Sequence, residues 1–326
     1  MNHPSPILDV RNLSVRFSIG RGNLFARQRY LHAVRDVSFS VQKGRTLGVV
    51  GESGSGKTTA AMAAIGLTPA YEGHVEFAGR DLLALSPDDL RATRRKLQVI
   101  FQDPYSSLNP RVRVGAAVRE PMDLMGIGTP AEREAHISEL FDLVGLHPDQ
   151  MVLFPHQFSG GQRQRISIAR ALAPSPDVIV CDEPVSALDV AIQAQILNLL
   201  RKLQVEFGVA YLFISHDLGV VRFMCDDVVV MYLGKVVETA TRADLFEHPR
   251  HPYTRALLDS VPSVKRRKSR GYTRVAAIAG DPPSPVNLPR GCAFAARCPC
   301  ARSNCREDAP KLKTEGARSV ACHFPL

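Results

Sequence analysis

The chain has 326 residues, 45% of them hydrophobic, which suits one large domain and a smaller appendage. Its formal net charge of +9 is compatible with nucleic acid or anionic lipid, but the densest basic run, at 265–268, is short and is better explained as a solvated linker. The first six residues lack the basic and apolar regions of a secretory signal, and no apolar run approaches the roughly 18 residues that span a bilayer. We therefore expect a cytosolic chain.

Alternating apolar and polar residues predict strands over 7–17 and 33–41, separated by a basic loop over 20–30. A short apolar strand at 46–50 and an alanine-rich helix over 59–66 follow. Between them, residues 51–58 match G-x-x-x-x-G-K-[ST] in the strand, loop, helix order that a phosphate loop requires. Lys57 should reach the β and γ phosphates, and Thr58 should ligate Mg²⁺. The candidate nucleotide-binding residues here are Gly51, Glu52, Ser53, Gly54, Ser55, Gly56, Lys57, Thr58 and Thr59.

A helical region is predicted from about 110 to 172. Within it, Thr129, Pro130 and Glu132 read as N-cap, N1 proline and capping-box glutamate of a helix that stops at Gly145. The region ends in a turn that opens another helix and offers N–H groups and a hydroxyl to an anion. This second phosphate-facing turn consists of Ser159, Gly160, Gly161 and Gln162.

Strands and helices then alternate, which predicts a mainly parallel α/β sheet. The pattern gives a buried strand at 178–181, an amphipathic helix over 192–207 that ends at Gly208, and a buried strand at 211–214. Asp182 and Glu183 follow the first of these strands. We expect Asp182 to hold Mg²⁺ mainly through water; the alternative is a pair of exposed acids in a turn before Pro184.

These motifs in this order resemble the ATPase subunits of ABC transporters, in which the signature turn of one subunit closes over nucleotide held by the phosphate loop of another. The resemblance implies an α/β fold over residues 1–247: a P-loop NTPase ABC nucleotide-binding domain with a RecA-like core, an antiparallel β subdomain and the helical subdomain. It also implies that Glu183 polarises the attacking water, that His216 contacts the γ-phosphate, and that Gln102 contacts Mg²⁺ and the water. A structural histidine and an ordinary turn glutamine are the alternatives.

The same resemblance assigns residues to a dimer. Asp189 matches an aspartate of the family's D-loop, which crosses the interface, although it could also be an N-cap. The turn at 159–162 would serve nucleotide bound to the partner subunit. An aromatic ring usually stacks on adenine, and Phe17 is the first candidate and Tyr30 the second, with a core or surface role open for both.

Beyond about residue 248 the composition shifts, and we place the boundary of a C-terminal extension, 248–326, there. Residues 251–258 resemble a segment of ATPase subunits from oligopeptide and dipeptide transporters, and the signature and D-loop segments resemble the F-type subunit. This resemblance implies import of peptides at the cytoplasmic face of the cell inner membrane. The partners would be a paralogous D-type ATPase, two membrane permeases and an extracytoplasmic solute-binding protein.

Other functions stay open at this point. Members of this group also move nickel and other small solutes. A soluble ABC ATPase acting on DNA or ribosomes would usually carry two cassettes, a coiled coil or a nucleic-acid module, and we expect no nucleic-acid partner. A regulatory subunit with a dead site is disfavoured by the intact motif residues.

Seven cysteines fall unevenly along the chain. Cys181 and Cys225 lie in apolar surroundings, which predicts inert core residues, whereas five cysteines crowd the tail, which favours metal over disulfide in a cytosolic chain. In the resembling family four matching cysteines hold a [4Fe–4S] cluster, and Cys300 is an extra thiol. Zinc, free thiols and the absence of a stable metal are the alternatives. The four candidate ligands are Cys292, Cys298, Cys305 and Cys322.

Overall fold

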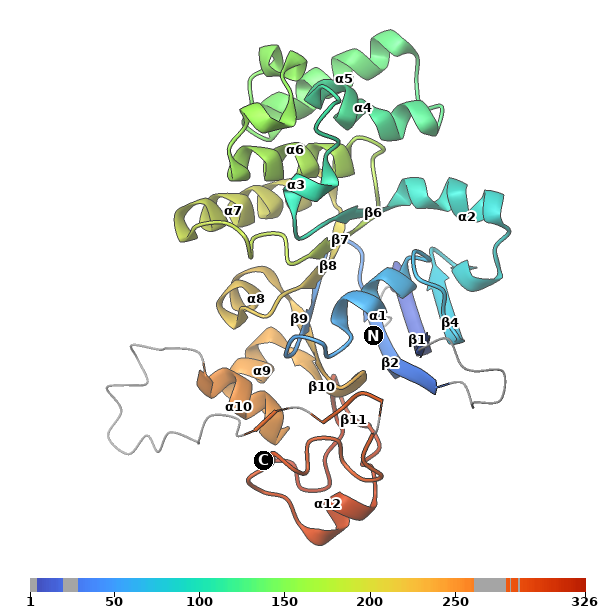
Figure 1. The fold of residues 1–326 in the computed structure, drawn as a ribbon, viewed down its shortest axis with the longest axis vertical. Helices are drawn as coiled ribbons and strands as arrows, with labels where there is room; N and C mark the ends of the chain where they lie inside the picture. Colours follow the sequence, from blue (N-terminus) through green and yellow to red (C-terminus); the bar gives the residue numbers. More distant parts are fainter. Residues whose placement is uncertain (1–4, 20–28, 261–279, 282, 287) are drawn as a thin grey trace. The chain divides into compact units, whose positions relative to one another are not determined.

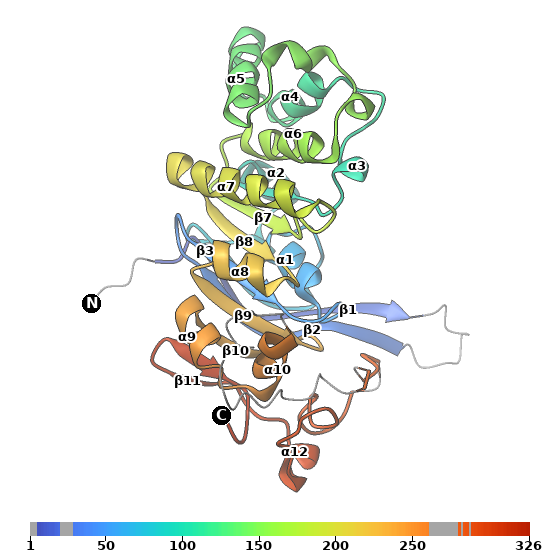
Figure 2. The same ribbon diagram turned by 90° about the vertical axis from the view of Figure 1, so that its left-hand side faces the viewer.

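The computed structural model describes residues 5–19, 29–260, 280–281, 283–286 and 288–326. Residues 20–28 of the basic loop predicted over 20–30 and the basic run at 265–268 lie outside these residues. Figures 1 and 2 show the ribbon from two sides. The chain divides into two compact units: unit 1 comprises residues 1–8, 40–46 and 76–214, and unit 2 comprises 9–39, 47–75 and 215–326.

Unit 2 contains most of both predicted N-terminal strands, and both are longer than expected. β1 runs over Leu8–Ile19 and β2 over Arg29–Val41, and β4 (Glu72–Phe77) follows them in the order β2, β1, β4. Tyr30 therefore lies in a strand and not in the loop predicted over 20–30, because the sheet extends the strand beyond its alternating pattern.

A second sheet in unit 2 carries the phosphate loop. Its order is β11 (Lys313–Glu315), β12 (Arg318–Val320), β10 (Lys235–Thr241), β9 (Asp227–Tyr232) and β3 (Thr46–Val50). β3 runs parallel to β9, while β10 is antiparallel to both β9 and β12. The C-terminal extension thus adds two strands to the sheet that leads into the phosphate loop. The division at 248 remains a prediction from composition.

Two helices of unit 2 can be compared with the prediction. α1 spans Lys57–Ala64 and starts two residues before the prediction, because Gly56, with φ of 96°, caps it. α10 confirms the expected helix after the proline turn near residue 252. Among its described residues, the unit also contains α8 (Leu218–Met224), α9 (Arg242–Glu247), α10 (Pro252–Ser260) and α12 (Ser303–Glu307).

Unit 1 holds the predicted parallel strands. β6 (Leu97–Ile100), β7 (Val178–Asp182) and β8 (Ala210–Ile214) are parallel, with Ile100 opposite Cys181 and Asp182 opposite Ile214. All residues of β7 and β8 are buried. The end of β4 pairs antiparallel with β5 (Arg80–Asp81). Because parallel strands present their carboxyl ends at one edge, Asp182 lies where catalytic side chains gather.

Helices make up the rest of unit 1. The α-helices are α2 (Pro87–Thr93), α3 (Pro104–Ser107), α4 (Val114–Leu124), α5 (Pro130–Leu143), α6 (Gly160–Leu172) and α7 (Val190–Phe207). Short 3₁₀ turns are η1 (Leu82–Ala84), η2 (Arg94–Lys96), η3 (Pro148–Val152) and η4 (Pro155–Gln157). Figure 1 shows α4, α5 and α6 gathered into one helical group, as predicted for 110–172.

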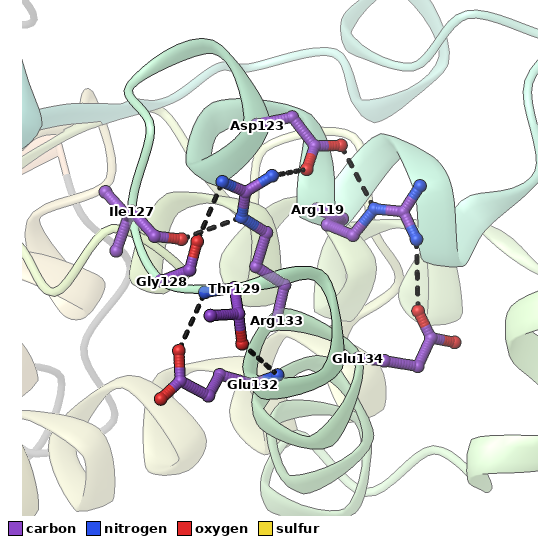
Figure 3. A network of polar contacts seen from close by, with 8 residues as sticks. All are labelled: Arg119, Asp123, Ile127, Gly128, Thr129, Glu132, Arg133 and Glu134. Carbon is purple, nitrogen blue, oxygen red and sulfur yellow. Dashed lines mark hydrogen bonds and ion pairs between the residues drawn. The ribbon is translucent and has the colours of Figure 1, made fainter.

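The connection between α4 and α5 is held by charged hydrogen bonds (Figure 3). Arg133 donates to the carbonyls of Ile127 and Gly128 at 2.7 and 2.9 Å and to the carboxylate of Asp123 at 2.7 Å. Thr129 and Glu132 form the predicted capping box. One arginine therefore satisfies two loop carbonyls, which fixes how α5 leaves α4.

Two further expectations concern the buried cysteines and membrane-spanning helices. Cys181 and Cys225 are fully buried, as predicted for core residues, and burial raises the pKa of the Cys225 thiol well above its usual range. In the described part of the chain, no helix is long and apolar enough to cross a membrane.

Candidate active site

The phosphate loop follows β3 directly, and two of its glycines are required by close backbone approaches. A Cβ on Gly51 would lie 2.2 Å from the carbonyl oxygen of Met231, and one on Gly56 would lie 2.3 Å from that of Ala33. Both residues also have positive φ, which side chains disfavour. The loop is thus packed tightly against its neighbours and opens into α1.

Polar groups line the loop as a phosphate site needs. Lys57 is buried, and its Nζ donates to the carbonyls of Gly51 and Glu52, both at 2.9 Å. The hydroxyl of Ser55 is buried with no hydrogen-bond partner among the described residues. A buried unpaired hydroxyl beside an ammonium group at a helix N-terminus suits a bound phosphate. Ser53, Gly54 and Thr58 are exposed, and Thr59 is half-buried at the start of α1.

Glu52 has two partners that sequence reasoning missed. Its backbone N–H donates to the hydroxyl of Tyr253 at 2.9 Å, and its carboxylate accepts two hydrogen bonds from Arg297, at 2.8 and 3.0 Å. These partners lie 201 and 245 residues away along the chain. No local pattern indicates such a contact, although Tyr253 belongs to the C-terminal segment singled out by resemblance.

In unit 1, three of the predicted segments meet at one cluster. The Nε2 of Gln102, just after β6, donates to the Oε2 of Glu183 at 3.1 Å and to the hydroxyl of Ser186 at 3.4 Å. Glu183 follows β7 with φ of 47°, a conformation that is rare for a residue with a side chain. Its N–H donates to Ile214 of β8, which anchors the strained backbone to the sheet. Strain held in this way is typical of functional sites.

Asp182 is the last residue of β7 and is 8% exposed. A carboxylate at this place, one residue before Glu183, is suited to hold a water-coordinated Mg²⁺ ion. Asp189 caps α7, because its Oδ1 accepts a hydrogen bond from the N–H of Ile192 at 3.0 Å. The N-cap role is therefore confirmed, and the interface role of Asp189 remains a prediction.

The second phosphate-facing turn begins α6 with a complete capping box. The hydroxyl of Ser159 accepts from the N–H of Gln162 at 3.3 Å, and the side chain of Gln162 accepts from the N–H of Ser159 at 3.0 Å. The first N–H groups of a helix have no partner within it, so those of Gly160 and Gly161 are available to an anion. Arg163 is buried and stacks over Tyr105, at 3.7 Å from the ring centroid, which ties the turn to α3.

Three other candidates lie in unit 2. His216 is exposed and follows Ser215, whose N–H donates to Val49 of β3. Phe17 is 44% exposed at the end of β1. Tyr30 packs against Arg16, whose guanidinium carbon lies 4.3 Å from the centroid of the tyrosine ring. An exposed Phe17 ring is free to stack on a base, but the choice between the two aromatic residues remains a prediction.

Two families match the chain. The ABC transporter family matches residues 34–186, and the C-terminal region of oligopeptide and dipeptide transporters matches residues 237–305. The chain is 50% identical over 322 residues to the oligopeptide transport ATP-binding protein AppF of Bacillus subtilis, covering 98% of this chain and 97% of that one. It belongs to the ATP-binding subunits of ABC transporters. A putative peptide import ATP-binding protein of Brucella abortus is 50% identical over 295 residues, covering 90% of this chain and 87% of its relative.

Solved structures agree with this family fold. The post-hydrolysis dimer of the ATP-binding cassette MJ0796, bound to ADP and phosphate, matches with a TM-score of 0.64 at 28% identity. The match covers 72% of this chain and 98% of that cassette. The ABC subunit therefore has the predicted P-loop NTPase fold and is an ATPase that uses ATP with Mg²⁺.

The cysteines of the ABC subunit's tail line one pocket. His251, Phe294 and Phe324 are among the other lining residues. Burial raises the pKa values of Cys292 and Cys322, and that of Cys298 to about 11, while neighbouring thiols disfavour ionisation further. Among the described residues, no group of three or more His, Cys, Asp or Glu side chains has the geometry of a metal site. The five lining cysteines are Cys292, Cys298, Cys300, Cys305 and Cys322.

Proposed function

We propose that this chain is the ATP-hydrolysing subunit that powers import of di- or oligopeptides across the cytoplasmic membrane. One observation carries the proposal: the match to an oligopeptide transport ATP-binding protein extends over 98% of the chain, including its C-terminal region. The region that distinguishes peptide transporters also contacts the phosphate loop, through Tyr253 and Arg297.

Each candidate residue has a definite task in hydrolysis. Lys57 binds the β and γ phosphates, and Thr58 and Asp182 hold Mg²⁺. Glu183 accepts a proton from the attacking water as general base. Gln102, hydrogen-bonded to Glu183, orients that water and Mg²⁺, and His216 contacts the γ-phosphate. Because the glutamate has a fixed backbone and a side-chain partner, it is held ready for this role.

The turn at 159–162 completes the ATP site of a second subunit, for which we propose a paralogous D-type ATPase. ATP then favours closure of the two subunits, and hydrolysis with phosphate release lets them part. Two membrane permeases at the cytoplasmic face would use this motion, and an extracytoplasmic solute-binding protein would deliver the peptide.

We also propose that Cys292, Cys298, Cys305 and Cys322 hold a [4Fe–4S] cluster. What supports the proposal is the chemistry of the donors: thiols from separate segments line one pocket, and a metal would neutralise the repulsion between their thiolates. Anaerobically purified protein should contain iron and sulfide in roughly a four-to-four ratio per chain. Stoichiometric zinc without iron, or neither metal, would contradict the assignment.

Uptake by cells tests the transport role. In cells that lack this chain but keep its permease genes, wild-type protein should restore accumulation of a labelled tripeptide, and Lys57→Ala should not. Labelled nickel, supplied in a parallel assay, should not accumulate. If nickel uptake is restored and peptide uptake is not, the proposed transported solute is wrong and the chain serves a nickel importer.

A further inference from the structure

The phosphate loop is held at Glu52 by three separate contacts. The carbonyl of Glu52 accepts a hydrogen bond from Lys57, its N–H donates to Tyr253, and its carboxylate accepts two hydrogen bonds from Arg297. The first contact involves the lysine that binds phosphate. The other two come from the C-terminal region, which therefore acts directly on the ATP site.

The guanidinium group of Arg297 is held by hydrogen bonds to Glu52 and Tyr232. Its side chain is 7% exposed and that of Glu52 is 26% exposed, so solvent screens their ion pair only in part. The Nη1 of Arg297 also donates to the hydroxyl of Tyr232 at 3.2 Å, and its hydrogen bonds to Glu52 raise the pKa of the guanidinium. Paired donors on paired acceptors define the orientation of both groups.

An aromatic cluster of Tyr232, Tyr253 and Phe294 packs beside the Arg297–Glu52 pair. The ring of Tyr232 lies 4.7 Å from that of Tyr253 and 5.4 Å from that of Phe294, measured between centroids. All three residues are buried. The N–H of Arg297 donates to the carbonyl of Phe294 at 2.9 Å, so the backbone of Arg297 is joined to the cluster as well.

The charge of the pair has a consequence for nucleotide binding. ATP is strongly anionic, and an unpaired carboxylate in the phosphate loop would repel it. Arg297 neutralises Glu52, and its two-pronged hydrogen bonding cannot be reproduced by lysine. Breaking a partly buried pair by removing one partner leaves the other charge uncompensated, which costs more than removing both.

Arg297 is also the residue directly before Cys298, which lines the cysteine pocket together with Cys292. A change in the conformation of this segment must move the backbone that carries the guanidinium. The side chain of Arg297 therefore joins the segment that lines the pocket to the phosphate loop.

We propose that Arg297 is a positioning residue of the ATP site, and that the cysteine segment around Cys298 sets the affinity for ATP through the Arg297–Glu52 pair. The inference needs only that the chain binds ATP. It depends neither on the transported solute nor on whether the cysteines hold a metal.

Calorimetric titration of the full-length chain with MgATP tests the first half. Arg297→Gln should weaken binding about tenfold, equivalent to about 1.4 kcal/mol. Adding Glu52→Gln should restore most of the affinity, because the uncompensated carboxylate is gone. Arg306→Gln, which removes an exposed arginine beside Cys305, is the matched control and should bind as wild type.

Two outcomes would overturn it: unchanged affinity in a folded Arg297→Gln chain, or a loss that Glu52→Gln does not restore. Thermal unfolding without nucleotide shows whether each variant is folded. If Arg297→Gln does not fold, Arg297→Lys replaces it, with an intermediate loss of affinity expected and wild-type affinity contradicting the role.

Cys298→Ser tests the second half. It should weaken ATP binding in a chain that keeps Glu52 and have little effect in a chain that carries Glu52→Gln. Equal affinities for wild type and Cys298→Ser would show that the cysteine segment does not reach the ATP site. A loss of the same size in both backgrounds would exclude the Arg297–Glu52 pair as the route.

Discussion

The Nε2 of Gln102 donates a hydrogen bond to the Oε2 of Glu183 across 3.1 Å. The two residues follow β6 and β7, which are adjacent parallel strands. Their side chains therefore meet at the carboxyl edge of the sheet, where Gln102 can orient the carboxylate of Glu183, our proposed base. The contact links the segment after β6 with the glutamate that we propose as the general base.

Removal of the glutamine side chain should slow hydrolysis more than it weakens binding. Gln102→Ala leaves the phosphate loop untouched, so the dissociation constant for ATP should stay close to that of wild type. Its ATP turnover should fall by about 10²-fold, because Glu183 and the water lose their partner. Asn109→Ala, an exposed change later in the same segment, serves as control. Full turnover by Gln102→Ala would remove the glutamine from the mechanism.

Gly161, in the second phosphate-facing turn, should not tolerate a side chain. A Cβ on Gly161 would lie 2.5 Å from the Cγ2 of Ile192 in α7, whereas one on Gly160 would meet Leu188 at an ordinary 3.5 Å. Gly161→Ala should lower the free energy of unfolding by about 1–3 kcal/mol, measured by urea denaturation. Gly160→Ala should be close to neutral. Adding Ile192→Ala should recover part of the loss, and no recovery would place the strain elsewhere.

Glu238 in β10 is the buried anchor of the segment that leads to α10. Its side chain is 1% exposed, accepts from the N–H groups of Arg250 and His251 at 2.8 and 2.9 Å, and lies 3.5 Å from the guanidinium of Arg318. Glu238→Ala leaves these donors unpaired and should lower the free energy of unfolding by about 3 kcal/mol or more. The matched control is Glu247→Ala at the exposed end of α9. Equal losses in both variants would contradict this account.

His251 should make the stability of the chain depend on pH. Burial lowers the pKa of its ring from the usual 6.5 to about 4. Between these values the unfolded chain binds a proton that the folded chain does not, so stability is full above pH 6.5 and falls as the pH drops through 4. The difference should approach about 3 kcal/mol.

His251→Asn keeps an acceptor for the N–H of Tyr253, which His251 meets through Nδ1 at 3.0 Å. This variant should lose that part of the pH dependence, measured by urea denaturation at pH values between 7 and 4. His248→Asn, an exposed histidine nearby, should keep it. If the free energy of unfolding depends on pH in the same way for wild type and His251→Asn, the claim that the His251 ring is buried and neutral is wrong.

Local signals made much of the fold predictable. The phosphate loop is a contiguous motif, and its glycines Gly51 and Gly56 are needed because they have positive φ and lie close to neighbouring backbone. The capping box at Thr129 and Glu132 spans four residues, and Asp182 ends a strand that its own apolar run defines. Each of these features depends on neighbours in the sequence.

Contacts between distant residues were not predictable. No pattern links Glu52 to Arg297, because the pair forms only after the C-terminal region has packed beside β9 and β10. Likewise, β12 pairs with β10 through a register that neither strand's sequence specifies. Tyr30 lies in β2 because strand pairing, a tertiary effect, extends the strand beyond its alternating pattern.

The most direct test of the central claim is ATP turnover by Glu183→Gln in the importer reconstituted with its permeases and peptide-loaded binding protein. Glu206→Gln, on the exposed face of α7, is the control. We predict that Glu183→Gln binds ATP like wild type but loses peptide-stimulated hydrolysis by a factor of about 10²–10⁴. Wild-type hydrolysis by Glu183→Gln would contradict the account.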